Sequence, residues 1–236
     1  MCIRDREHSE PLDEAVCCEV MFDDDTSGEV PEHQVFIYQA AIPALEKLGV
    51  PVRVLRSEKT YTSVFMGKVT RGPKQGMIRS FPMCGKCYVQ RDCKMHPIRQ
   101  YQKTLPSDTV QYIGIAKDEP QRLARLGGNQ VSLLEKYGYT EDDAKQLCKQ
   151  AGLLSPVYEF TDRGGCWFCP NAKLSELRHL YDHHPDLWQK MMRQMCIRDR
   201  PKEGACVYGL LWELTDKCEA SLDRCEGCLL YTSCKL

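Results

Sequence analysis

Short apolar runs alternate with amphipathic stretches along the first part of the chain. Residues 15–22 form a mostly apolar run that ends at three successive aspartates, which is typical of a buried parallel strand followed by a polar loop. Pro31 begins a stretch with apolar residues at helical spacing that ends at Gly49, and residues 50–55 form a second apolar run. A strand, a helix and a strand in this order form a βαβ unit, so the pattern predicts an α/β fold with a parallel sheet.

Further along, residues 110–116 are expected to form a third strand, which again ends at acidic residues. Ligands of open α/β sheets bind beyond the carboxyl ends of the strands, so we expect a site that joins residues 25–29 and 118–122 to the cysteine clusters described next. The periodicity and the capping residues predict further helices at 60–65, 97–103, 140–150, 174–181 and 185–192.

Two cysteine clusters lie more than seventy residues apart in the sequence, and each contains a Cys-x-x-Cys unit. Such units present two sulfurs to one metal, so the pair predicts a zinc or iron–sulfur site, although buried free thiols would give the same composition. Four thiolates suit both zinc and a [4Fe–4S] cluster, and a fifth cysteine leaves one thiolate for chemistry. The expected ligands are Cys166 and Cys169 together with two of the three residues Cys84, Cys87 and Cys93.

Composition narrows the class of protein. The 236 residues are 42% hydrophobic and 28% charged, which is enough for one well-filled domain. A net charge of −1 argues against binding to nucleic acid by bulk charge, and no apolar stretch is long enough to span a bilayer. Fifteen cysteines behind a charged, non-signal-like start indicate ligation or redox chemistry rather than a disulfide scaffold, so we expect a cytoplasmic protein without a membrane partner.

The hexapeptide Met-Cys-Ile-Arg-Asp-Arg occurs twice, at residues 1–6 and 195–200, between unrelated flanks. It resembles translated adapter sequence and does not belong to a repeat architecture. We therefore expect residues 7–194 to form the native α/β domain, with its cysteine clusters at 84–93 and 166–169. Residues 1–6 and 195–236 are interpreted as non-native.

An ordered set of motifs between residues 11 and 193 resembles the phosphoadenosine phosphosulfate (PAPS) reductase family. Asp25–His33 is similar to its aspartate-threonine-glycine and proline-glutamate segment, and Cys93–Pro97 to its lysine-x-x-proline element. Ile113–Arg122 resembles the end of its third strand. Residues 152–158 followed by 163–170 resemble a subgroup with a cysteine-ligated cluster.

This resemblance implies a Rossmann-like adenine nucleotide alpha-hydrolase fold that binds ATP or a sulfonucleotide such as PAPS. The family's Ser-Gly-Gly-x-Asp-Ser phosphate loop is missing upstream of Pro11, so we interpret the chain as lacking its first strand and expect it to be inactive as written. The family's mobile C-terminal cysteine nucleophile cannot be assigned to Cys206 or Cys218, and no catalytic residue is predicted.

Several polar residues are candidates for binding the nucleotide. Arg91 and Lys94 flank Cys93, where cations would lower a thiol pKa and attract phosphate or sulfate, unless both are merely solvated. The strand-end acids could bind ribose, Mg²⁺ or phosphate, or could simply cap helices and loops. The full set is Asp25, Thr26, Ser27, Gly28, Glu29, Arg91, Lys94, Asp118, Glu119 and Arg122.

Other residues are assigned structural roles. Trp167 and Phe168 are expected to pack over the cluster and exclude water from it. We expect Cys17, Cys18 and Cys148 to lie in the core, and the histidines at 179, 183 and 184 to lie on the surface.

The implied function is reduction or transfer of sulfur on an adenine nucleotide or sulfonucleotide, with an iron–sulfur cluster and a thiol or thioredoxin-like reductant. One alternative is ATP-dependent thio-modification of tRNA or DNA, which adds a nucleic acid substrate. Another alternative, of a different class, is a non-catalytic binding module stapled by zinc.

Overall fold

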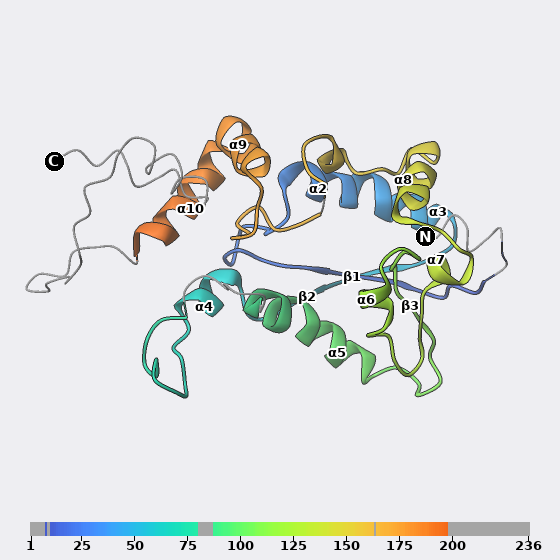
Figure 1. Cartoon of the computed structure of the whole chain (residues 1–236), viewed down its shortest axis with the longest axis horizontal. Coiled ribbons are helices and arrows are strands. Elements are labelled where there is room, and N and C mark those ends of the chain that lie inside the picture. Colours follow the sequence, from blue (N-terminus) through green and yellow to red (C-terminus); the bar gives the residue numbers. More distant parts are fainter. Residues whose placement is uncertain (1–7, 9, 80–86, 163, 198–236) are drawn as a thin grey trace, which may run out of the picture. The chain divides into compact units, whose positions relative to one another are not determined.

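The computed structural model describes residues 8, 10–79, 87–162 and 164–197, with the side chains placed up to residue 193. It shows a mixed α/β protein that divides into two units, Met1–Ala172 and Lys173–Leu236, which are described separately (Figure 1). Within the described part of the chain, no helix combines the length and the apolar character needed to cross a membrane.

The first unit begins with the βαβ arrangement that the sequence predicts. Strands β1 (Ala15–Glu19) and β2 (Val52–Arg56) pair in parallel, with Ala15 opposite Val52 and Glu19 opposite Arg56. The connection is helical throughout and comprises α2 (Pro31–Phe36), the π-helical η1 (Ile37–Ala41) and α3 (Ile42–Lys47). Figure 1 shows this connection on one side of the strand pair and α5 (His96–Gln102) on the other.

The two π-helical segments that the structure describes in the first unit each end two residues before a proline. Pro43 follows η1, and Pro97 follows η2 (Gln90–Met95). Proline has no N–H for the carbonyl four residues earlier, and its ring clashes with that carbonyl, so the helix widens there. For Pro97 that carbonyl belongs to Cys93, and it accepts a hydrogen bond from the Cys18 thiol at 3.5 Å.

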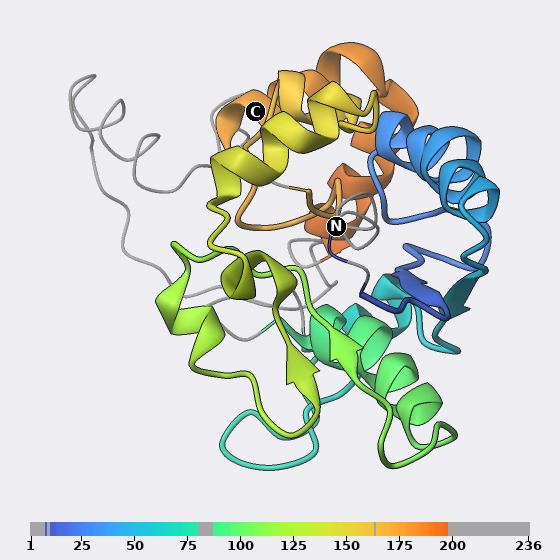
Figure 2. The ribbon, with the colours of Figure 1, turned by 90° about the vertical axis from the view of Figure 1, so that its right-hand side faces the viewer.

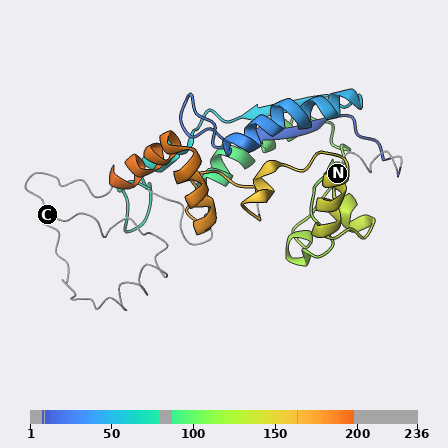
Figure 3. The ribbon, with the colours of Figure 1, turned by 90° about the horizontal axis from the view of Figure 1, so that it is seen from above.

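The third strand differs from its prediction. Strand β3 contains only Gln111–Tyr112 and pairs in parallel with β4 (Gln130–Val131) instead of joining β1 and β2. A tight turn explains the early end, because the N–H of Ile115 bonds to the carbonyl of Ile113 and takes the chain out of the strand. Figures 2 and 3 show this green to yellow-green region, which also contains α6 (Pro120–Leu123) and α7 (Leu133–Lys136), beside the β1–β2 pair.

Most of the predicted helices are present. Capping boxes begin α4 (Tyr61–Met66) at Thr60 and α8 (Glu141–Gln150) at Thr140, as their sequences indicate. The 3-10 turn η3 (Pro156–Glu159) follows α8. The second unit contains α9 (Leu174–His183) and α10 (Pro185–Ile197), close to the predicted 174–181 and 185–192.

Four aromatic rings form the centre of the first unit's core. Phe22 and Trp167 lie with ring centroids 4.5 Å apart, and Tyr61 and Phe168 with centroids 4.1 Å apart. All four side chains are buried. Cys18 is also buried, as expected, but Cys17 and Cys148 are only half-buried, so their assignment to the core was wrong. Neighbouring strand residues face opposite sides, which explains why Cys17 does not share the environment of Cys18.

Gly28 is required by close packing. A Cβ at this position would lie 2.7 Å from the carbonyl oxygen of Val20 and 2.9 Å from the ring of Phe168. The N–H of Gly28 also donates to that carbonyl at 2.7 Å, so the backbone cannot easily move away. The glycine therefore brings the segment after β1 into contact with the aromatic core.

We predict that Gly28→Ala lowers the free energy of unfolding by about 1–3 kcal/mol, the usual cost of overpacking a core. Urea denaturation measures the change. Gly127→Ala is the matched control, because a Cβ at Gly127 meets no atom within 4 Å. Equal stability of the two variants would contradict the packing role of Gly28.

Glu19 is a buried carboxylate at the end of β1. It accepts hydrogen bonds from Tyr38 Oη at 2.7 Å, Gln34 Nε2 at 3.0 Å and Arg56 Nε at 2.8 Å. Burial alone would raise its pKa, but the hydrogen bonds and the charge of Arg56 outweigh burial and lower the pKa of Glu19 below its ordinary value. These contacts connect β1, β2 and the helical connection.

Because the folded protein holds a lowered Glu19 pKa, ionised Glu19 stabilises the fold above the unfolded pKa, and this contribution disappears as pH falls through the folded pKa. We predict that Glu19→Gln costs about 2 kcal/mol at neutral pH and that the difference from wild type shrinks below about pH 4. Urea titrations across pH measure it, with Glu46→Gln on the exposed face of α3 as the control. A pH-independent difference would disprove the linkage.

Candidate thiol and cation site

The second cysteine pair is fixed to the segment that follows β1. Glu29 and Cys166 form an antiparallel bridge, and the N–H of Trp167 donates to the carbonyl of Gly28 at 3.1 Å. The indole N–H of Trp167 donates to the carbonyl of Ser27 at 2.8 Å. The structure therefore brings together residues 27–29 and 166–169, which the sequence predicted to share one site.

The first cysteine cluster lies around η2 in the same unit. Cys93 is fully buried in η2, and Cys87, which precedes it, is exposed. The Cys87 sulfur accepts a hydrogen bond from the N–H of Gln90 at 3.3 Å. Hydrogen bonds of this kind to sulfur are one of the means by which proteins tune metal–thiolate sites. Cys84, the remaining predicted ligand, lies outside the described residues.

Charged side chains influence the pKa values of the thiols around Cys166. Burial, the carboxylate of Glu29 and the Cys169 thiol together raise the pKa of the Cys166 thiol to about 12, and the ammonium group of Lys94 opposes them. Burial also raises the pKa of Glu29, again against the effect of Lys94. The Cys17 thiol, whose pKa is raised mainly by burial, belongs to the same group. The charge of one lysine thus acts on a half-buried carboxyl group and on two thiols.

The donor set fits a thiophilic metal or cluster. The described cysteines are all free thiols, and burial raises the pKa of both Cys93 and Cys166, to about 11 and about 12. A bound cation removes the proton from such a thiol outright, which relieves this penalty. Among the described residues, no three sulfurs lie within 4.8 Å of one another, so a single tetrahedral ion would need these side chains to move closer.

The strand-end acids predicted to bind a nucleotide are engaged in local structure. Asp118 accepts a hydrogen bond from the N–H of Glu141 at 3.0 Å and so caps α8. Glu119 pairs with Arg122 and accepts the N–H of Ala116 at 3.2 Å. The capping alternative therefore describes Asp118, whereas Glu119 and Arg122 form a local ion pair at the start of α6.

Of the other residues predicted to bind the nucleotide, some are engaged in local contacts and others are not. Arg91 forms a two-point ion pair with Asp92, at 2.6 and 2.8 Å, and is held beside its own helix. Asp23 closes the loop after β1 by accepting the N–H groups of Thr26 and Asp25. Asp25 itself is exposed. Of the predicted cations, exposed Lys94 is the one whose charge acts on Cys166, Glu29 and Cys17.

His33 and Ser155 are part of the site that the residue patterns did not single out. The His33 Nδ1 and the Ser155 hydroxyl lie 2.8 Å apart, from α2 and from the turn before η3. Burial and then the charge of Lys94 lower the pKa of His33, so the imidazole is close enough to sense the same ammonium group. Both residues lie inside motifs that resemble the PAPS reductase family, and these motifs were the feature of the sequence that could have identified them as site residues.

Comparisons with protein-family models, with curated proteins and with solved structures give no match for this chain. The resemblance to the PAPS reductase family therefore rests on the sequence motifs, and the architecture is defined as mixed α/β with small parallel sheets.

We predict that Cys166→Ser lowers both the metal content and the thermal stability of the purified protein, because it removes one predicted thiolate ligand beside the aromatic core. Elemental analysis for iron and zinc and a thermal melt measure the two effects. Cys148→Ser in α8, a half-buried cysteine outside both clusters, is the control. Unchanged metal content in Cys166→Ser would refute the ligand assignment.

Proposed function

We propose that this protein acts in sulfur chemistry on an adenine nucleotide or sulfonucleotide, using a thiolate-held iron–sulfur cluster beside an anion-binding lysine. The observation that carries the proposal is the bridge between Glu29 and Cys166, two groups whose raised pKa values are both opposed by the charge of Lys94. It joins two motifs of the PAPS reductase resemblance and one cysteine pair in a single group of residues. A Rossmann-like extension of the β1–β2 pair belongs to the same proposal.

Within this proposal each side chain has a distinct task. Lys94 binds the sulfate or phosphate of the substrate, since an ammonium group beside thiols attracts anions. Cys87, Cys93, Cys166 and Cys169, with Cys84 as the alternative ligand, hold the cluster, which supplies electrons or a sulfur site when bound. Trp167 and Phe168 exclude water from one side of it.

The proposed thiol chemistry indicates a cellular compartment and a reductant. Free thiols persist in a reducing compartment, so we propose a cytoplasmic location and a thiol or thioredoxin-like reductant. Thio-modification of tRNA or DNA would use the same site with a nucleic acid substrate, and a strict requirement for that substrate would distinguish it from reduction of a free sulfonucleotide.

A specific observation favours a second candidate, the zinc-stapled binding module. Asp118 bonds to the first turn of α8, and Glu119 is engaged by Arg122 and by the N–H of Ala116, which leaves fewer groups to hold a nucleotide. In that module the cysteines would serve stability alone, as structural zinc sites do.

The two candidates are separated by metal content and by nucleotide binding. We expect anaerobically purified protein to contain iron and acid-labile sulfide and to bind PAPS. Replacing Lys94 with alanine should weaken PAPS binding about tenfold or more, the cost of one charge-assisted contact, and leave adenosine binding unchanged. Calorimetric titration of both ligands measures this.

Lys47→Ala, at an exposed position in α3, is the control for the loss of one positive charge. Equal PAPS affinity of the Lys94 and Lys47 variants would refute the anion-binding role of Lys94. Colourless protein with stoichiometric zinc and no affinity for PAPS or ATP would instead establish the binding module.

A further inference from the structure

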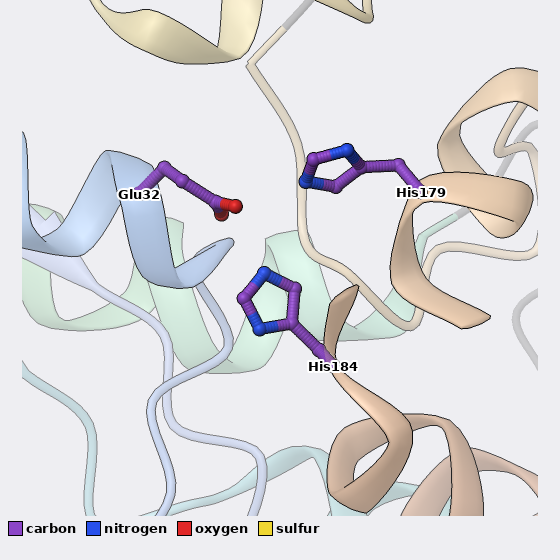
Figure 4. Close-up of side chains that lie close together, drawn as sticks. All are labelled: Glu32, His179 and His184. Carbon is purple, nitrogen blue, oxygen red and sulfur yellow. The ribbon is translucent and has the colours of Figure 1, made fainter. Parts of the chain in front are cut away.

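The histidines of the second unit belong to the end of α9. The Nδ1 of His183 lies 3.1 Å from the carbonyl oxygen of His179, and the N–H of His184 donates to the carbonyl of Leu180 at 2.9 Å, where the helix ends. His183 is exposed, as the sequence predicts, whereas His179 and His184 are half-buried, with ring centroids 5.7 Å apart. Figure 4 shows these two with Glu32, which belongs to the first unit, so we assign the three no common site.

Positive charge is concentrated in one part of the sequence. Between Glu58 and Asp92 the chain contains seven basic residues and no acidic residue. The whole chain has a net charge of −1, so the remaining residues carry a net charge of −8. Such an asymmetry within an otherwise acidic protein indicates a surface that binds a polyanion.

The described residues at the centre of this stretch form a hairpin, residues 67–79, which we call the basic hairpin. Figure 1 shows it as a loop that extends from the end of α4. Lys68 and Ile78 form an antiparallel bridge between its arms, and the N–H of Val69 donates to the carbonyl of Met77 at 2.8 Å. The basic residues are therefore held on a defined backbone.

Hydrogen bonds and glycines define the turn of the hairpin. Gly72 and Gly76 have φ values of 86° and 83°, a left-handed conformation that favours glycine. The N–H of Gln75 donates to the carbonyl of Gly72 at 3.0 Å, and the N–H of Gly76 donates to the carbonyl of Val69 at 2.8 Å. The tip is thus a closed turn.

Three cations of the basic hairpin are available to a partner. Lys68, Arg71 and Lys74 are all exposed, and no carboxylate of the described residues lies within 4.0 Å of their charged groups. The fourth cation, Arg79, pairs instead with Asp92 at 3.6 Å. Exposed lysine and arginine side chains of this kind form the sequence-independent contacts of proteins to phosphates.

The base of the hairpin is fastened to η2. The guanidinium of Arg79 lies over the ring of Tyr88, 5.8 Å from its centroid, and that of Arg91 lies over the same ring at 5.2 Å. The hydrogen bond from Arg91, followed by nearby positive charges that include Lys59, lowers the pKa of Asp92 in spite of its burial. One carboxylate among several cations leaves the base of the hairpin positive.

We propose that the basic hairpin binds the phosphate backbone of a single-stranded nucleic acid through Lys68, Arg71 and Lys74. A flexible strand can follow a narrow turn and bring successive phosphates to its cations, which a stiff duplex cannot do as readily. The half-buried ring of Tyr88 beside the base adds the aromatic group that accompanies basic residues on surfaces of this kind. The inference goes beyond the proposed sulfur chemistry and does not rest on it.

The distribution of apolar residues favours a nucleic acid over a lipid surface. Segments that insert into the membrane interface bury a continuous apolar face. The exposed apolar residues of the hairpin, Met77 and Ile78, lie on its returning arm, whereas residues 71–76 at the tip contain no large apolar side chain. The part of the hairpin farthest from α4 is therefore suited to phosphates.

The test is the affinity of the full chain for a fluorescein-labelled oligothymidylate, measured by fluorescence anisotropy at several salt concentrations. The hairpin variant carries Lys68→Gln, Arg71→Gln and Lys74→Gln. It should bind about tenfold or more weakly than wild type at low salt. Its plot of log affinity against log salt should be less steep by about two, because each phosphate contact to a single strand contributes about 0.7.

A control variant removes three positive charges at exposed positions elsewhere in the first unit. Its substitutions are Lys47→Gln, Lys103→Gln and Lys149→Gln. It has the same net charge as the hairpin variant and should bind as wild type does. Equal affinities and salt slopes of the two variants overturn the proposal. Hairpin-dependent binding to phosphatidylserine vesicles, without hairpin-dependent binding of the oligonucleotide, assigns the surface to a membrane and also overturns it.

A second measurement needs no variant and therefore does not depend on the folding of one. Lysines of the wild-type protein are acetylated with an N-hydroxysuccinimide ester and identified by mass spectrometry. The oligothymidylate should protect Lys68 and Lys74 and leave the exposed Lys47 and Lys149 reactive. Equal acetylation of Lys68 and Lys74 with and without the oligonucleotide contradicts the proposal.

Discussion

The packing of four aromatic rings holds the described site together. Phe22 follows β1, Tyr61 begins α4, and Trp167 and Phe168 lie between the two cysteines of the second pair, so three distant segments meet in one buried group. Burial of large aromatic rings stabilises a fold strongly, and these four rings concentrate that contribution at one point. The cysteine pair takes its position from its own intervening residues, before any metal is considered.

This arrangement determines the electrostatics of the site. The same packing that buries Trp167 places Cys166 against Glu29, so that a thiol and a carboxyl group share a poorly solvated space that disfavours the ionised form of both. Lys94 offsets only part of that cost. If a cation binds there, as we propose, it would relieve this cost, and thiol ligands would favour a soft metal.

The sequence predicted the elements that local pattern controls. The βαβ unit and the capping boxes at Thr60 and Thr140 are confirmed because apolar spacing and cap residues act over a few positions. The short β3 was missed because a turn at Ile113–Ile115 overrides an apolar run. The partners of Asp118 and the grouping of His179 with His184 depend on where other helices begin and end, and pattern alone does not specify this.

The prolines after the two π-helical segments have a geometric consequence. Pro97 leaves the carbonyl of Cys93 for the Cys18 thiol, and the widened turn before it adds a residue, which rotates the preceding side chains by about 100° relative to the rest of α5. The proline thereby sets the rotational phase at which Cys93 faces inward while Lys94 remains exposed. The number of residues between Pro97 and Cys93 thus determines which side chains face inward, just as the choice of residue types does.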